Sequence, residues 1–217
     1  MPRRAFLAGA LSLAPAVVRA AAPQAATPAA EPRAAVTPPG ARGTRPFLDR
    51  CTGCQLCVSA CLTGVLRPAF LEYGFEGMMK PRMDFASAYC NYDCRRCGEA
   101  CPTGAIVELA LEEKKLTSIG VAQFTRRLCI VEAKGKDCVA CSEHCPTKAV
   151  ETVPFGENLR LPQVNEELCI DCGACEYACP VGPERAIVVA ARPAHARARK
   201  PAEEPPSARR ADGGFPF

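Results

Sequence analysis

The sequence predicts an α+β fold assembled from four copies of one short cysteine-bearing unit. The 217 residues contain sixteen cysteines in four groups of four, and the first cysteines of successive groups lie 39, 39 and 40 residues apart. A fixed period of this length indicates an internal repeat whose units pack against one another. Short apolar runs flank the groups, so each unit is expected to read strand, ligand loop, short helix, strand. The repeats are expected at about 47–67, 86–109, 121–153 and 161–191.

The fourth group has the spacing of an iron–sulfur ligand set. Cys169, Cys172, Cys175 and Cys179 follow the pattern C-x2-C-x2-C-x3-C, and Pro180 comes directly after. The first three thiolates of such a run bind one 4Fe-4S cluster, and the fourth binds the other cluster in two-cluster ferredoxins. A zinc site would use two separated pairs and would have no role for the third cysteine. We therefore expect iron–sulfur clusters rather than zinc.

The other three groups vary the same pattern. The first keeps the spacing but has Leu62 where a proline is expected, which leaves the turn after its fourth cysteine less constrained. The second has three residues in its first gap and the third has eight, and insertions of this kind are tolerated in a loop. All sixteen cysteines are therefore predicted iron ligands: Cys51, Cys54, Cys57, Cys61, Cys90, Cys94, Cys97, Cys101, Cys129, Cys138, Cys141, Cys145, Cys169, Cys172, Cys175 and Cys179.

Composition agrees with stabilisation by metal ligation. Only 6% of the residues are aromatic and none is tryptophan, which makes a poor hydrophobic core for this length. A disulfide framework is the other interpretation of a cysteine-rich exported chain. It is disfavoured because the cysteines within a group are too close in sequence to pair with one another and because every group repeats one ligand pattern.

Two such units form the bacterial ferredoxin fold, in which each unit lends its fourth cysteine to the cluster of the other. Four groups thus predict two bacterial-ferredoxin-like modules with four 4Fe-4S clusters, built from four βαβ-type repeats. Groups one and four share the unmodified spacing, and groups two and three carry insertions. This likeness favours nested pairing, in which group one pairs with group four and group two with group three. Cys179 would then be the fourth ligand of the cluster held by group one, and Cys61 that of the cluster held by group four. Cys145 would be the fourth ligand for group two, and Cys101 that for group three. Sequential pairing is the alternative and would use the same sixteen ligands.

Charge is unevenly distributed along the chain. Residues 1–43 carry five arginines and one glutamate, residues 192–217 carry six basic and three acidic residues, and residues 44–191 have a formal charge of −3. Each oxidised cluster with its four thiolates adds about −2. The body is therefore expected to be acidic, which suits a partner with a basic docking face and makes nucleic acid an unsuitable partner.

Residues 1–22 have the pattern of an export signal, in which Arg3 and Arg4 precede an apolar stretch and then small residues. The apolar stretch is too short to span a membrane. The two arginines favour the twin-arginine route over an ordinary basic signal, since a protein carrying clusters should cross the membrane already folded. A periplasmic location is expected. Residues 23–43 are predicted to be a disordered linker, residues 44–191 the folded domain, and residues 192–217 a disordered tail.

Two further features have alternative interpretations. Residues 67–89 form a long insert between the first two groups and contain three methionines, so the insert is either a lid that shields a cluster or an adaptable docking surface. His144 lies between Cys141 and Cys145 and is expected to be an ordinary helix residue, the alternative being an imidazole ligand. No Gly-rich phosphate loop or Ser/His/Asp set is present, so no catalytic residue and no small-molecule substrate are expected.

The paired arginines, the linker, the four cysteine groups and the long first gap of the third group resemble the NapG/MauM family of periplasmic ferredoxin-type polyferredoxins, over about residues 44–191. Leu62 and the gap after Cys90 depart from that pattern, so a close sister family is equally compatible. The resemblance implies a non-enzymatic electron carrier. Its partners would be a membrane-bound quinol dehydrogenase, which would also hold it at the membrane, and a periplasmic reductase or cytochrome.

Other functions fit the same residues. The chain could be a fixed iron–sulfur subunit of a molybdenum or tungsten oxidoreductase, and then it would co-purify with a catalytic chain. It could also be a maturation factor for an exported redox enzyme, and then it would be needed during biosynthesis of that enzyme but not during turnover. A zinc-bound structural module is the remaining alternative.

Overall fold

The structure is a computed structural model that describes residues 34–200. The predicted export signal, residues 23–33 of the predicted linker and residues 201–217 lie outside the described range. The described residues all belong to one compact unit. Within that range the elements are short helices and short strands, which agrees with the predicted α+β class. No helix in the described part of the chain has the length and apolar character needed to cross a membrane.

The first half of the described chain holds cysteine groups one and two. Its two strands pair antiparallel, Leu66 opposite Met83, and carry the chain from group one back to group two. The third cysteine of each group lies on a short helix. The elements are α1 (Thr44–Arg50), α2 (Leu56–Ala60), β1 (Leu66–Pro68), the 3-10 helix η1 (Phe75–Gly77), β2 (Pro81–Met83), α3 (Arg96–Glu99) and α4 (Leu111–Lys114).

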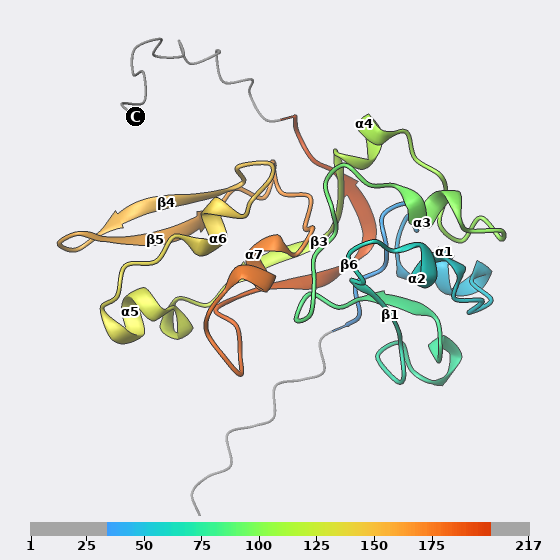
Figure 1. The fold of residues 1–217 in the computed structure, drawn as a ribbon, viewed down its shortest axis with the longest axis horizontal. Helices are drawn as coiled ribbons and strands as arrows, with labels where there is room; N and C mark the ends of the chain where they lie inside the picture. The colour runs from blue at the N-terminus through green and yellow to red at the C-terminus, as the bar shows by residue number, and fades with distance from the viewer. Residues whose placement is uncertain (1–33, 201–217) are drawn as a thin grey trace, which may run out of the picture. The chain divides into compact units, whose positions relative to one another are not determined.

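The second half holds groups three and four and contains two antiparallel strand pairs (Figure 1). One pair joins the strand before group three to the strand after group four, and the other is a hairpin between the two groups. The elements are β3 (Thr117–Phe124), η2 (Arg126–Leu128), α5 (Ile130–Lys134), α6 (Ala140–Glu143), β4 (Val150–Phe155), β5 (Leu159–Val164), α7 (Ala174–Ala178) and β6 (Ile187–Arg197).

The β3–β6 pair depends on a glycine at its irregular point. The register shifts between Ser118 and Gly120, and Gly120 lies opposite Ala191. A Cβ on Gly120 would lie 2.5 Å from the Ala190 carbonyl oxygen, so only glycine allows the strands to approach this closely. Arg192 Nε donates to the Gly120 carbonyl oxygen at 3.0 Å and stabilises the same point.

Turns in the second half follow from residues that tolerate left-handed backbone. Gly156 and Asn158, with φ of 63° and 59°, close the β4–β5 hairpin. Helix α5 ends at Gly135, whose φ of 61° is typical of a helix C-terminus. The eight-residue gap of group three therefore forms a short helix with a glycine stop.

Two hydrophobic cores lie beneath the cysteine groups. The first surrounds Phe47, Val65 and Ile106 and contains cysteines of groups one and two. The second surrounds Val131, Val150 and Ile187 and contains cysteines of groups three and four. Within residues 34–200, cysteines make up six of the thirteen buried residues of the second core, whereas Cys57 is the one cysteine among the buried residues of the first.

The predicted boundaries of the folded part were too narrow at its start. Residues 34–43, placed in the disordered linker, are packed and almost wholly buried, Thr37 being 2% exposed. The carbonyl oxygens of Val36, Gly40 and Arg42 accept backbone hydrogen bonds from Met83, Val107 and His195. Alanine, proline and threonine composition suggested disorder, but these backbone groups find partners in the folded part.

The predicted tail begins too early as well. Strand β6 extends to Arg197 because β3 pairs with both of its ends, with Phe124 opposite Ile187 and Thr117 opposite Arg197. Residues 192–197 are therefore strand rather than tail. A short strand was expected after each of groups one and two. The strand after group one is β1, which starts at Leu66. The strand expected after group two does not form, since residues 103–107 are turns and loop.

Candidate iron–sulfur centres

Cysteines from neighbouring groups line common cavities. One cavity is lined by Cys90, Cys94 and Cys97 of group two together with Cys61 of group one. In the second half, another cavity is lined by Cys129, Cys138 and Cys141 of group three with Cys179 of group four. Each cavity thus has three cysteines from one group and the fourth cysteine of its neighbour. We call these set II and set III.

The remaining eight cysteines form two sets in the same way. Cys57 interacts electrostatically with Cys51, Cys54 and Cys101, which we call set I. Set IV consists of Cys169, Cys172, Cys175 and Cys145. Its members are linked through Cys175, which interacts electrostatically with the other three. The helices that carry the third cysteines also touch within each half, α2 against α3 and α6 against α7. All sixteen predicted ligands are thereby placed in four sets.

Nested pairing of groups one with four and two with three was wrong, and the structure has sequential pairing. The physical reason is the connection between groups. The β1–β2 pair returns the chain from group one to group two, and the β4–β5 hairpin returns it from group three to group four, so neighbouring groups meet by short connections. Nested pairing would have required groups one and four to meet instead.

Similar spacing predicts loop shape, although it does not predict the partner. In groups one and four the loop has two residues with positive φ, Gly53 and Gln55 in one and Asp171 and Gly173 in the other. Groups two and three, which carry insertions, instead begin their helices from residues near φ −130°. Each half therefore combines one loop of each shape.

Threonine hydroxyls approach the fourth cysteine in three of the groups. The distance from sulfur to hydroxyl oxygen is 3.7 Å for Cys61 and Thr63, 3.6 Å for Cys101 and Thr103, and 3.7 Å for Cys145 and Thr147. The fourth group has Val181 at the equivalent position. Sequence reasoning missed this feature, although the recurrence of threonine two residues after the fourth cysteine was a readable signal.

Leu62 does not disturb the turn that follows Cys61. The Gly64 N–H donates to the Cys61 carbonyl oxygen, as the Lys148 N–H does to Cys145 in group three. Gly64, Gly104 and Lys148 all have positive φ at the same place in the repeat. The turn after Cys61 therefore keeps the form it has in groups two and three although Leu62 replaces the proline.

Burial and backbone donors shift the cysteine pKa values in opposite directions. Burial chiefly, and the charge of neighbouring cysteines to a lesser extent, raise the pKa of the Cys57, Cys97 and Cys141 thiols to about 12. Burial alone would also raise the pKa of Cys61 and Cys101, but backbone N–H groups and the threonine hydroxyls outweigh it and lower these values. Hydrogen bonds of this kind stabilise thiolate, the form that binds iron.

The residues present fit 4Fe-4S clusters. Sets II and III each contribute four cysteines to the lining of one cavity, which is the number a cluster needs because each of its irons takes one thiolate. Among residues 34–200, no three histidine, cysteine, aspartate or glutamate side chains converge on a point as they would around a single metal ion.

Comparison with known proteins identifies the family. The family described as a 4Fe-4S dicluster domain matches residues 28–105 and 135–183. A methylamine utilization ferredoxin-type protein MauM from Methylorubrum extorquens is 32% identical over 156 residues, covering 68% of this chain and 69% of that protein. This chain belongs to the NapG/MauM-type ferredoxins. It carries the dicluster domain of 4Fe-4S proteins.

A second curated relative is also a ferredoxin-type protein. The ferredoxin-type protein NapF of Escherichia coli K12 is 29% identical over 146 residues, covering 67% of this chain and 80% of that protein. Among solved structures, a match is found in a complex from Methanospirillum hungatei that contains formate dehydrogenase, heterodisulfide reductase and formylmethanofuran dehydrogenase. The TM-score is 0.29 and the sequence identity is 22%, and the match covers 68% of this chain and 50% of that chain.

The cysteines of the ferredoxin-type chain are unequally protected. In the second half every cysteine is buried except Cys138, which is half-buried. In the first half only Cys57 is buried, and Cys54 is exposed. The first half is therefore the more accessible to solvent and to reagents.

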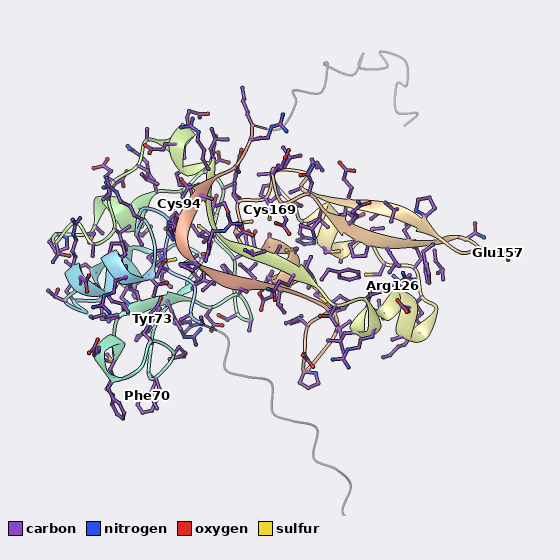
Figure 2. The ribbon with its side chains drawn as sticks, turned by 180° about the vertical axis from the view of Figure 1, so that it is seen from behind. Phe70, Tyr73, Cys94, Arg126, Glu157 and Cys169 are labelled. Atoms are coloured by element: carbon purple, nitrogen blue, oxygen red, sulfur yellow. The ribbon has the colours of Figure 1, made fainter. Side chains whose placement is uncertain are left out.

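The insert between the first two groups, residues 67–89, was expected to be either a lid over a cluster or a docking surface, and the structure matches each interpretation only in part. Its tip is exposed, Phe75 being 83% and Phe70 69% accessible, and Figure 2 shows Phe70 directed away from the rest of the unit. Its base packs inward, with the Tyr73 hydroxyl donating to the carbonyl oxygens of Val36 and Pro81. The tip aromatics do not act as a lid, whereas Met83 and Phe85 at the end of the insert are buried.

The two histidines lie away from the cysteine cavities. His144 hydrogen-bonds through Nδ1 to the Ala140 carbonyl oxygen, one helical turn earlier, and does not line either cavity. His195, assigned to the tail, is half-buried in β6, and its Nε2 hydrogen-bonds to the Thr37 hydroxyl at 2.8 Å. Neither histidine is therefore placed as a ligand.

Proposed function

We propose that this ferredoxin-type protein is an electron carrier with four 4Fe-4S clusters, one in each cysteine set, and that its two halves are bacterial-ferredoxin-like modules. The observation that carries the proposal is the exchange of fourth cysteines between neighbouring groups, seen at both cysteine-lined cavities. This exchange is the arrangement of two-cluster ferredoxins.

The clusters supply the one-electron chemistry, and the residues of the chain supply its environment. Each set would hold its cluster between three cysteines of one group and the fourth cysteine of a neighbouring group. The apolar side chains that share the cavities, such as Val65 and Met83 around set II and Ile187 around set III, exclude water. Backbone and threonine donors at Cys61 and Cys101 stabilise negative charge on sulfur and so tune the reduction potential.

The proposal extends to location and partners. The paired arginines at residues 3 and 4 support export of the loaded protein to the periplasm by the twin-arginine route. There the chain would accept electrons from a membrane-bound quinol dehydrogenase and pass them to a periplasmic reductase or cytochrome. It would have no substrate chemistry of its own. The names of the relatives, ferredoxin-type proteins, support the carrier role.

Anaerobic purification followed by counting of iron and acid-labile sulfide tests the cofactor content. About sixteen irons and sixteen sulfides per chain are expected for four clusters. Low-temperature electron paramagnetic resonance (EPR) of the reduced protein should show 4Fe-4S signals. Zinc in place of iron, or four or fewer irons, would refute the proposal.

Export and partnership are tested separately in the producing cell. Replacing Arg3 and Arg4 by lysine should retain the loaded protein in the cytoplasm, while the unchanged chain reaches the periplasm. If both forms remain in the cytoplasm, the periplasmic part of the proposal is wrong. Stoichiometric co-purification with a molybdenum or tungsten subunit would instead show a fixed subunit, and a requirement limited to biosynthesis of another enzyme would show a maturation factor.

A further inference from the structure

The two halves of the chain meet at cysteine ligands. The Cys90 N–H of group two donates to the Cys172 carbonyl oxygen of group four at 2.9 Å. These residues belong to set II and set IV, which lie in different halves. A direct backbone hydrogen bond between ligand residues places the two sets next to each other.

Side chains on either side of this hydrogen bond close the contact. Phe85 packs on Gly173, where a Cβ would lie 1.9 Å from the phenyl ring. The rings of Tyr89 and Tyr177 have their centroids 5.4 Å apart. A short stretch before and including Cys90 thus packs along the loop that carries Cys172 and along the helix α7 that follows it.

A buried lysine lies at the same contact. Lys114 is 3% exposed, and its ammonium donates to the carbonyl oxygens of Asn91 and Tyr92 in the loop of group two. It is also close enough to Cys90 and Cys172 to interact electrostatically with both. A buried cation placed between two ligand cysteines offsets the negative charge expected of the loaded sets.

Within each half, the sets meet through their third cysteines. Cys57 of set I interacts with Cys97 of set II, and Cys141 of set III interacts with Cys175 of set IV. These cysteines lie on the helix pairs α2–α3 and α6–α7, which contact each other. Together with the Cys90–Cys172 contact, the neighbours define one sequence of sets: I, II, IV, III.

We propose that the Cys90–Cys172 contact is the junction for electron transfer between the halves, so that the four clusters work as a single file in the order I, II, IV, III. The inference rests on the proposed function. With clusters bound by both sets, the junction would pass one electron from the reduced group held by set II, which would be oxidised, to the group held by set IV, which would be reduced. No bond forms or breaks and no proton moves. A low-potential one-electron donor supplies one end of the file, and a one-electron acceptor of higher potential receives at the other.

Magnetic coupling between reduced clusters tests the order. A Cys138→Ala variant removes the cluster of set III, and a Cys172→Ala variant removes that of set IV; iron counts that fall by about four per chain confirm each loss. In the fully reduced Cys172→Ala protein, the cluster of set III should give an isolated, uncoupled EPR signal. In reduced Cys138→Ala protein, the cluster of set IV should remain coupled, because set II lies beside it.

An isolated signal from set IV in the Cys138→Ala protein would overturn the single-file order, since it would show that the halves do not communicate. Cys54→Ala is the matched variant in the first half. It removes the cluster of set I and should leave set II coupled to set IV. Iron content of the unchanged protein separates this result from the proposed function. Four or fewer irons per chain would refute the proposed function itself, whereas about sixteen irons with an isolated signal from set IV would refute only the single-file order.

Lys114 gives an independent test with a matched control next to it in the chain. Lys114→Met removes the charge and retains the length, and it should shift the potentials of the clusters in sets II and IV to more negative values. Lys115→Met should leave them unchanged, because Lys115 contacts Asp93 and Glu112 at the surface rather than the junction. Lys114→Arg should restore the potentials. Equal effects of the two methionine variants would refute the role of Lys114 at the junction.

Discussion

Val181 occupies the position at which the other three groups have a threonine close to the fourth cysteine. Hydrogen bonds to ligand sulfur stabilise the more negative, reduced cluster. We predict that Val181→Thr raises the potential of the cluster in set III by roughly 20–60 mV, the equivalent of one hydrogen bond of about 0.5–1.5 kcal/mol. EPR-monitored redox titration measures the shift.

The reverse change provides the control. Thr147→Val should lower the potential of the cluster in set IV, whose fourth ligand is Cys145, by a similar amount. Unchanged potentials in both variants would show that the hydroxyls do not donate to sulfur in the loaded protein.

His195 should make stability depend on pH. Burial lowers its pKa to about 4, so the folded chain keeps the imidazole neutral while the unfolded chain takes up a proton near its ordinary pKa of about 6.5. Stability contributed by this residue is therefore complete above about pH 7 and falls as the pH drops through 6.5 toward 4. We predict that His195→Gln lessens the decrease in melting temperature of the loaded protein between about pH 7.5 and 5.5. Parallel pH profiles for the two proteins would contradict this.

At the scale of elements, the end of the insert matters more than its tip. Phe85 is 5% exposed and packs on the loop of group four, whereas Phe75 is 83% exposed. We predict that Phe85→Ala speeds the loss of iron to a chelator, because it opens the space between sets II and IV. Phe75→Ala, the control, should leave the rate unchanged. The rate is measured anaerobically from the absorbance of the iron–chelator complex, and a faster loss in Phe75→Ala would restore the lid interpretation.

The sequence was sufficient to predict the grouping of the cysteines and the approximate place of most strands, because both are encoded locally. Cys129 and Cys169 follow apolar runs, and β3 and β5 lie near the runs expected, although they end before the cysteines. The partner of each group was not encoded locally. Spacing correctly indicated that groups one and four have similar loops, but the connections through β1–β2 and β4–β5 determine which groups meet.

Some residues of the candidate site left no local signal. Lys114 is one of two adjacent lysines in a charged stretch, and only the fold shows that it is buried while Lys115 stays at the surface. Residues 34–43 likewise have the composition of a linker, and only their hydrogen bonds to Met83, Val107 and His195 show otherwise.

For the whole molecule, protection differs between the halves. The second half has seven of its eight cysteines buried, and the first half has one of eight. We predict that a chelator removes iron in two stages, about eight irons from sets I and II first and about eight from sets III and IV later. Iron counts paired with EPR at each stage check the order. Simultaneous loss from all four sets would indicate that the halves open together.

The charge of the whole folded unit differs from the prediction. Residues 34–200 carry twenty-one basic and nineteen acidic residues, a formal charge of +2. The predicted body, residues 44–191, left out five basic residues that the structure places with the fold: Arg42, Arg192, Arg197, Arg199 and Lys200. With four clusters at about −2 each, the unit reaches about −6. Attraction to a basic partner is therefore weaker than the sequence suggested.

The pairing of β3 with β6 has a consequence for biosynthesis. Thr117 leaves the ribosome long before Arg197, so β3 waits without its partner strand until nearly all of the described chain has been made. Sets III and IV lie between these strands in sequence, so the second half can close around its clusters only late in synthesis. A chain truncated before β6 would expose an unpaired strand edge, and that edge is a feature by which quality control can distinguish an unfinished protein from a complete one.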